Sequence, residues 1–169
     1  MTLPMTPAQF HALLQAEGLF PAMEALNHGI AHRYTGIFQV IESQLINVFL
    51  YDKQQEVRPE ALAVVALDDS FCQFVLRDGS LLVDNSMHDE RLLSSSFRGV
   101  VVAYHGVPVT YPRGGLYGTL CHFDLIEQSL AQPQFELLQA AGGLLYPYLQ
   151  HLDGRMDCAP QAARAVAAL

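Results

Sequence analysis

The sequence predicts an α+β domain in which a mainly antiparallel sheet is covered by helices on both faces. Apolar, β-branched segments that can pair as hairpins occupy 36–51 and 99–124, and helical patterns flank them on both sides. The segments 99–109 and 116–124 lack alternating polarity, so both faces of their sheet should be buried. A chain of 169 residues has the length of one such domain.

The composition narrows the class of protein. The chain is 51% hydrophobic and carries a net charge of −8, so it has no general attraction to phosphate and nucleic acid is not an expected partner. The N-terminus lacks the basic and apolar regions of a signal peptide, and no apolar stretch is long enough to span a bilayer. We therefore expect a cytoplasmic protein without a membrane partner. Its three cysteines are too few and too widely spaced for a disulfide framework or a zinc site.

Two helices are expected first along the chain. Thr6 and Gln9 have the spacing of a capping box, with Pro7 at the first helical position. Gly18 closes this helix, and a second helix with one apolar stripe begins near Pro21. These signals place a helical pair before the first strand.

A hairpin follows the helical pair. The segments 36–41 and 45–51 are rich in β-branched and aromatic residues and predict two strands that turn near 42–44. The polar stretch 52–60 is expected to be a loop.

A further helix is expected to begin at Ser70, which forms a second capping box with Gln73. Gly79 ends it, because glycine accepts the left-handed conformation common at helix C-termini. A short strand at 81–83 follows, and the polar segment 84–91 is a loop whose first residues favour a turn.

The last elements are two strands and a helix. The strands 99–109 and 116–124 are joined by a turn at 111–115. A long helix with a wide apolar face begins at Pro133, and Pro147 should kink or break it because the proline ring clashes with the preceding turn.

One domain over 1–153, including the terminal helices, and an Ala-rich tail over 154–169 are expected from these patterns. The small residues at 140–143 suit close approach of another helix. A homodimer formed through the helices that begin near Pro21 and Pro133 is therefore expected.

Four motifs resemble the pattern of GAF domains, and the resemblance covers about 22–152. They are Ser70-Phe71-Cys72, Leu82-Val83-Asp84, Tyr104-His105-Gly106-Val107-Pro108-Val109 and Gly118-Thr119-Leu120-Cys121-His122-Phe123-Asp124. The resemblance implies a GAF-like (PAS/profilin-like) fold with a central six-stranded antiparallel sheet. It also implies a ligand pocket on one face of the sheet and terminal helices on the other. GAF domains bind cyclic nucleotides, tetrapyrroles, amino acids, 2-oxoacids or formate, and some bind nothing, so the ligand and any cofactor stay unnamed.

The pocket is expected between the sheet and the helix that begins at Ser70. Strand phase and family position predict the residues that bind the ligand: Phe71, Cys72, Val75, Asp84, His88, Tyr104 and His122. Binding would order the nearby loops and bias the terminal helices, which would pass the signal to a separate partner protein.

Two side-chain groups leave alternatives open. A turn at 111–115 sets His105 nearly opposite His122, and imidazoles so placed can bind a transition metal or heme, or satisfy each other and backbone carbonyls. The second interpretation is preferred, and no metal ligand is assigned. Cys72 and Cys121 each lie among apolar residues in the sequence, which is typical of buried structural cysteines.

Three functions remain open at this level. The preferred one is a small-molecule-binding sensory or regulatory module. The second is a thiol-dependent enzyme, because free methionine-(R)-sulfoxide reductases are GAF domains with three cysteines, although their Gly-Val-Cys-Gly turn is absent here. The third is a structural dimerisation module without a ligand. An enzyme is less expected than a binding module, and no catalytic residue is assigned.

Overall fold

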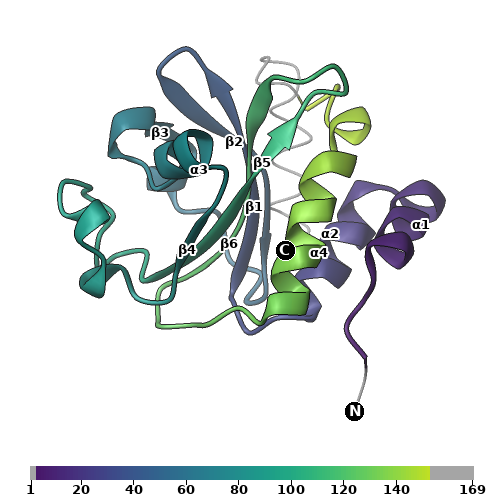
Figure 1. The fold of residues 1–169 in the computed structure, drawn as a ribbon, viewed down its shortest axis with the longest axis horizontal. Coiled ribbons are helices and arrows are strands. Elements are labelled where there is room, and N and C mark those ends of the chain that lie inside the picture. The colour runs from purple at the N-terminus through teal and green to yellow at the C-terminus, as the bar shows by residue number, and fades with distance from the viewer. Residues whose placement is uncertain (1–2, 153–169) are drawn as a thin grey trace.

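Six antiparallel strands form the centre of the computed structural model, which describes residues 3–152 (Figure 1). The strands lie in the order β3-β2-β1-β6-β5-β4. They are β1 (Tyr34–Ile41), β2 (Gln44–Asp52), β3 (Val64–Ala66), β4 (Leu81–Val83), β5 (Ala103–Thr110) and β6 (Leu116–Asp124). The α-helices are α1 (Pro7–Glu17), α2 (Leu19–His28), α3 (Cys72–Asp78) and α4 (Gln132–Leu144). The expected α+β class with a six-stranded antiparallel sheet is confirmed, and the expected tail at 154–169 lies outside the described residues.

Helices cover both faces of the sheet. The sequence predicted this, because polar and apolar residues do not alternate along its last two strands. Helices α1, α2 and α4 pack on one face, and α3 packs on the other together with short 3-10 turns (Figure 1). Each face has its own apolar core. The core under the three helices includes Phe10, Met23, Ile37, Tyr117 and Leu138, and the core under α3 includes Phe38, Val75, Leu81, Tyr104 and Phe123.

Local sequence signals set most element boundaries. The Thr6 hydroxyl accepts from the Gln9 amide at 3.2 Å, and the Gln9 side chain accepts from the Thr6 amide at 2.8 Å, which completes the predicted capping box. Gly18 separates α1 from α2, and Gly79 ends α3 in the left-handed conformation with φ +87°. Helix α2 begins at Leu19, slightly before the expected start near Pro21.

Three expectations about element boundaries need correction. The third strand, Val64–Ala66, was not expected, because a three-residue edge strand carries too little pattern to identify it. Strand β5 begins at Ala103 rather than at Gly99, whose positive φ of +79° interrupts an extended strand. Helix α3 begins at Cys72 rather than at Ser70. The Ser70 hydroxyl still accepts from the Gln73 amide at 3.2 Å, but the Gln73 side chain donates to the Ser70 carbonyl.

Two prolines lie where the pairing of one strand edge and the α4 helix come to an end. Strand β4 pairs with Tyr104–Gly106 only, so Pro108 lies beside an open edge of β5, where a proline is tolerated. Helix α4 ends at Leu144 before Pro147, which confirms the predicted break. The helix also approaches β5 closely, because a Cβ atom at Gly142 would lie 2.5 Å from the Pro108 carbonyl oxygen.

Candidate functional site

A small cavity lies between α3 and the sheet, on the face opposite the terminal helices. Its volume is about 40 Å³. Side chains from β1, β2, β3, β5 and β6, from the turn before β3, from the start of α3 and from the segment before β5 line it. The lining residues are Phe38, Leu45, Leu62, Val65, Ser70, Phe71, Cys72, Phe97, Val101, Tyr104, Cys121 and Phe123. Among these described residues none is charged, and five are aromatic.

A cluster of thiol and hydroxyl groups adjoins the cavity. The Cys72 sulfur lies 3.1 Å from the Tyr104 hydroxyl and accepts from the Thr119 hydroxyl at 3.2 Å. The Cys121 thiol donates to the Gly36 carbonyl at 3.7 Å. These contacts pair the polar atoms next to the cavity with one another and with the backbone, so the cavity wall itself is almost entirely apolar.

The thiols and the phenol of this cluster differ in their acidity. The hydrogen bond from the Cys121 thiol, with those from Thr119 and Tyr104, lowers the pKa of Cys72 in spite of burial. Burial raises the pKa of Cys121 and that of Tyr104 well above their usual values. Cys72 is therefore the more acidic of the two thiols, because its sulfur accepts the hydrogen bonds.

The structure brings three of the seven predicted site residues to this cavity, namely Phe71, Cys72 and Tyr104. Val75 is buried in the same core but does not line the cavity. The remaining three lie elsewhere: Asp84 bonds to His105, His88 is exposed, and His122 is buried on the opposite face of the sheet.

Strand alternation explains why His122 is separated from the cavity. Successive side chains of a strand point to opposite faces, so Cys121 and Phe123 face α3 and His122 faces the terminal helices. Tyr104 pairs with Phe123 across β5 and β6, and this pairing was the available signal for Phe123. Leu62 and Val65 carried no such signal, because they belong to the short segment around β3.

Three histidines meet on the other face of the sheet. His105 and His122 are register partners, as the turn at 111–115 predicts. His32 joins them from the connection between α2 and β1: its Nε2 lies 2.9 Å from His105 Nδ1, and its ring centroid lies 5.8 Å from that of His122. His105 Nε2 reaches Asp84 at 2.9 Å, and His122 Nδ1 reaches the Thr35 hydroxyl at 2.7 Å. The imidazoles thus bond to each other and to neighbouring side chains through some of their ring nitrogens, in part as the preferred interpretation expects.

Burial keeps this histidine cluster uncharged at neutral pH. Desolvation lowers the pKa of His32 to about 4, that of His105 below its usual value, and that of His122 well below it. His32 Nδ1 and His122 Nε2 have no hydrogen-bond partner. Within residues 3–152, no group of three or more His, Cys, Asp or Glu side chains is arranged to hold a metal ion. The three rings therefore form a buried, uncharged cluster in which two ring nitrogens have no partner.

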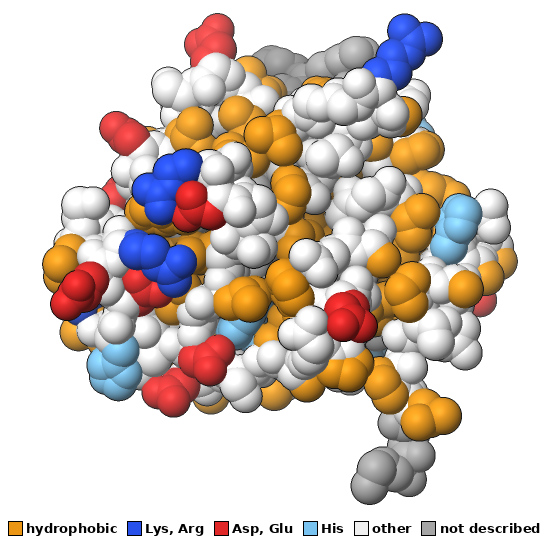
Figure 2. All heavy atoms as spheres, in the orientation of Figure 1, with side chains coloured by type: hydrophobic (Ala, Val, Ile, Leu, Met, Phe, Trp, Pro, Cys, Tyr) orange, Lys and Arg blue, Asp and Glu red, His pale blue; other side chains and the backbone are white. Residues whose placement is uncertain are grey.

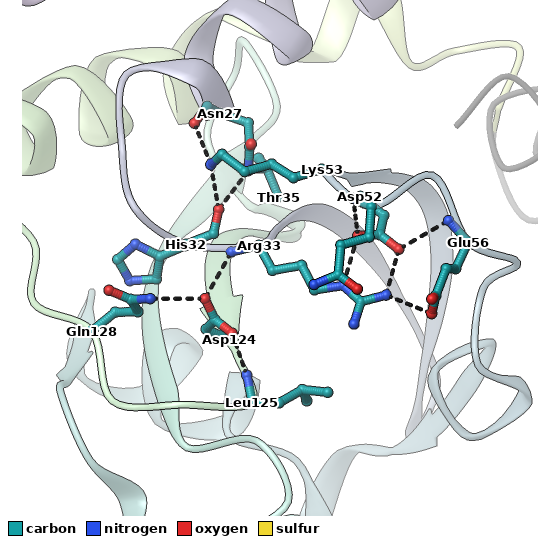
Figure 3. Close-up of polar contacts among 11 residues, drawn as sticks. Asn27, His32, Arg33, Thr35, Asp52, Lys53, Glu56, Asp124, Leu125 and Gln128 are labelled. Atoms are coloured by element: carbon teal, nitrogen blue, oxygen red, sulfur yellow. Dashed lines mark hydrogen bonds and ion pairs between the residues drawn. The ribbon is translucent and has the colours of Figure 1, made fainter.

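Charged side chains anchor the connection that carries His32 (Figure 3). The Lys53 ammonium donates to the carbonyls of Asn27, Ile30 and His32 at 2.9, 2.9 and 2.5 Å. Arg33 pairs with Asp52 at 2.7 Å, and its backbone amide donates to Asp124 at 2.9 Å. These contacts hold the end of α2 against β2 and β6.

The molecular surface has no basic patch on the face that Figure 2 shows. The Lys and Arg side chains on the left of this view lie next to acidic ones, and another stands apart at the upper right (Figure 2). Among the described residues, no helix combines the length and the apolar character that crossing a membrane requires.

The architecture is that of a GAF domain. The GAF domain from an Acinetobacter phosphoenolpyruvate-protein phosphotransferase superposes with a TM-score of 0.67 at 15% identity, covering 89% of this chain and 95% of that one. Free methionine-R-sulfoxide reductase from Neisseria meningitidis, in complex with its substrate, superposes with a TM-score of 0.63 at 14% identity, covering 93% and 89%. The reduced enzyme from Staphylococcus aureus gives 0.64 at 16% identity, covering 88% and 99%. No protein-family model and no curated protein matches the chain.

Proposed function

We propose that this chain is a small-molecule-binding regulatory module of the GAF type, which acts as a homodimer and signals to a separate partner protein. The observation that carries the proposal is the cavity between α3 and the sheet, with the hydroxyl–thiol cluster of Cys72, Tyr104 and Thr119 beside it. Mostly apolar walls with a few placed polar groups are typical of small-molecule sites.

The position of the cavity suggests how binding would be transmitted. Its walls include α3 and the loop residue Phe97 on one side and strands that include β5 and β6 on the other. Strands β5 and β6 carry α4 on their opposite face, where Gly142 approaches Pro108 closely. A ligand that favours one position of α3 would also favour one arrangement of the sheet beneath it. The terminal helices on the other face would shift with the sheet, and this would change the surface that contacts a second copy.

A thermal-shift screen against nucleotides, amino acids, oxoacids, heme and small neutral compounds tests the proposal. A compound at 100 times its dissociation constant should add about 2.7 kcal/mol of stability. The variant Val65→Phe, which fills the cavity, should abolish the shift, whereas Val64→Phe, on the same strand but 49% exposed, should keep it. If every compound fails, the module is structural. Sedimentation equilibrium tests the dimer, and a monomer at micromolar concentration would contradict that part.

The thiol-dependent enzyme fits this cavity less well. Reduction of a sulfoxide by two thiols forms a disulfide, and the oxygen leaves as water. Cys72 and Cys121 are suitably close to the cavity, but free methionine sulfoxide also carries an ammonium and a carboxylate, for which the lining offers no charged partner. A thioredoxin-coupled assay with NADPH should show no turnover of methionine sulfoxide. Turnover that disappears in Cys72→Ser would establish the enzyme instead.

A further inference from the structure

We infer that His32, His105 and His122 form an acid-sensitive lock: when they take up protons, the segment 29–33 between α2 and β1 detaches from the sheet more often, while both apolar cores stay folded. The lock makes the proton concentration a further input to the fold, and it does not involve the cavity under α3. The position of His32, the direction of its hydrogen bonds and the nature of the other contacts of the segment support it.

The segment 29–33 joins the first two helices to the sheet, and the ring of His32 reaches from it to β5 and β6. This ring is completely buried. Its Nε2 lies 2.9 Å from His105 Nδ1 on β5, and the centroid of the His122 ring on β6 is 5.8 Å away. The preceding helix α2 is held instead by apolar side chains such as Met23, whose contacts do not depend on pH. Polar contacts therefore hold the segment, and part of them is made by groups that titrate.

The hydrogen bonds around His105 determine which ring nitrogens carry protons at neutral pH. The Asp84 carboxylate only accepts, so His105 Nε2 donates to it at 2.9 Å. Neutral His105 then has an unprotonated Nδ1, which accepts from His32 Nε2. The other nitrogen of neutral His32, Nδ1, is therefore an acceptor, and it has no partner. The bond between the two rings exists because one of them has a nitrogen without a proton.

Protonation removes this bond. An imidazolium carries a proton on both nitrogens and accepts no hydrogen bond, so the bond between His32 and His105 is lost once both rings are charged. Two cations whose ring centroids lie 4.9 Å apart then repel each other. Opening of the segment hydrates the charged rings, and it also hydrates His122 Nε2, which has no partner in the closed cluster. Opening therefore becomes more favourable as the pH falls.

The charges that surround His32 do not prevent this change. The titratable and charged groups that face it or its cluster partners are His105 on β5, His122 and Asp124 on β6, Lys53 after β2 and Asp84 after β4. Burial, helped by His105 and Lys53, lowers the pKa of His32 from 6.5 to about 4, although the two carboxylates raise it. Burial also lowers the pKa of His105 and His122. The closed cluster thus disfavours protons that the open segment binds readily.

The other charged contacts of the segment keep their charge in mild acid. The Lys53 ammonium donates to three carbonyls of residues 27–32 and stays protonated as the pH falls. Arg33 pairs with Asp52 at 2.7 Å. Burial raises the pKa of Asp52, but hydrogen bonds from Arg33 and two backbone amides bring it below 3.8, so this pair persists at pH 5. These contacts set how rarely the segment opens at neutral pH, and the histidines set how the opening changes with pH.

Hydrogen exchange of the ¹⁵N-labelled native protein at pH 7.5 and pH 5.0 tests the lock. The backbone amide of Arg33 reports the segment, because it donates to Asp124 at 2.9 Å, and the amide of Leu120 in β6 reports global unfolding. After correction for the intrinsic exchange rate, opening at Arg33 should increase about 25-fold, as expected when the pKa of one histidine rises from about 4 to 6.5 on opening. Low urea should leave this opening unchanged, because a local opening exposes little surface.

Two results on the wild-type chain would overturn the lock. One is an increase at Arg33 of less than threefold. The other is an opening at Arg33 with the same urea dependence as that at Leu120, which would mean that the segment opens only when the whole domain unfolds.

Variants connect the pH dependence to the histidines. His32→Gln keeps a polar side chain that does not titrate, so it should reduce the increase at Arg33 at least fivefold. His88→Gln makes the same change at an exposed position outside the cluster and should keep the full increase. If His32→Gln keeps it as well, another group causes the opening and the lock is wrong. If His32→Gln fails to fold, the ¹⁵N shifts of the wild-type His32 ring at pH 7.5 decide instead: a proton on Nε2 is expected, and a proton on Nδ1 would contradict the lock.

Discussion

Mild acidification should lower the free energy of unfolding of this protein, because its buried histidines become protonated when the chain unfolds. His32 is completely buried, and desolvation lowers its pKa from 6.5 to about 4. Below pH 6.5 the unfolded chain therefore binds a proton that the folded chain does not, and the free energy of unfolding falls as the pH falls. The loss begins near pH 6.5 and is complete near pH 4.

The magnitude follows from the size of the shift. A shift of about 2.5 units for His32 corresponds to about 3 kcal/mol between pH 6.5 and pH 4, at ~1.4 kcal/mol per unit. His105 and His122 add to this loss in the same direction, because burial lowers the pKa of both. Carboxylates act in a different window: burial raises the pKa of Asp52, but hydrogen bonds from Arg33 and two backbone amides bring it below 3.8, so its contribution is lost only at lower pH.

Urea denaturation at pH 4.5, 5.5, 6.5 and 7.5 measures this effect. The wild-type chain should lose more than 2 kcal/mol between the highest and lowest pH. His32→Gln keeps a polar side chain but does not titrate, so it should reduce the slope of unfolding free energy against pH. His88→Gln makes the same change at an exposed position and should keep the wild-type slope. An unfolding free energy at pH 4.5 equal to or above that at pH 7.5 would refute the reasoning.

Further predictions concern stability, each measured by urea denaturation at pH 7.5. Gly142→Ala should lower the free energy of unfolding by about 1–3 kcal/mol through overpacking, because its Cβ would lie 2.5 Å from the Pro108 carbonyl oxygen. At Gly143 a Cβ meets nothing within 4 Å, so Gly143→Ala should raise the free energy of unfolding by about 0.5–1 kcal/mol. Equal effects of the two variants would contradict the close approach at Gly142. Lys53→Met removes the donor to three carbonyls at the end of α2 and should cost about 1–2 kcal/mol, allowing for solvent screening. Thr6→Ala should cost about 1 kcal/mol by removing the cap of α1, and no change would mean that the cap is unimportant.

Part of the candidate site could be predicted from the sequence because its signals are local. The SFC motif at the start of α3 predicted Phe71 and Cys72, and the YHGVP motif predicted Tyr104; all three line the cavity. His122 was assigned to the same pocket although it pairs with His105, and a residue that neighbours Cys121 must face the opposite side of the sheet. The register was correct, but the choice of face was not.

The sequence by itself determined the α+β class, the capping box of α1, the end of α3 at Gly79, the turn that pairs His105 with His122 and the break at Pro147. Each depends on residues a few positions apart, whose conformational preferences act without the rest of the fold. Only the tertiary structure decided the cavity walls from β3, the gathering of His32 with two strand histidines, and the absence of charge around the cavity. These features join segments far apart along the chain, and their contacts are set by how the sheet and helices pack.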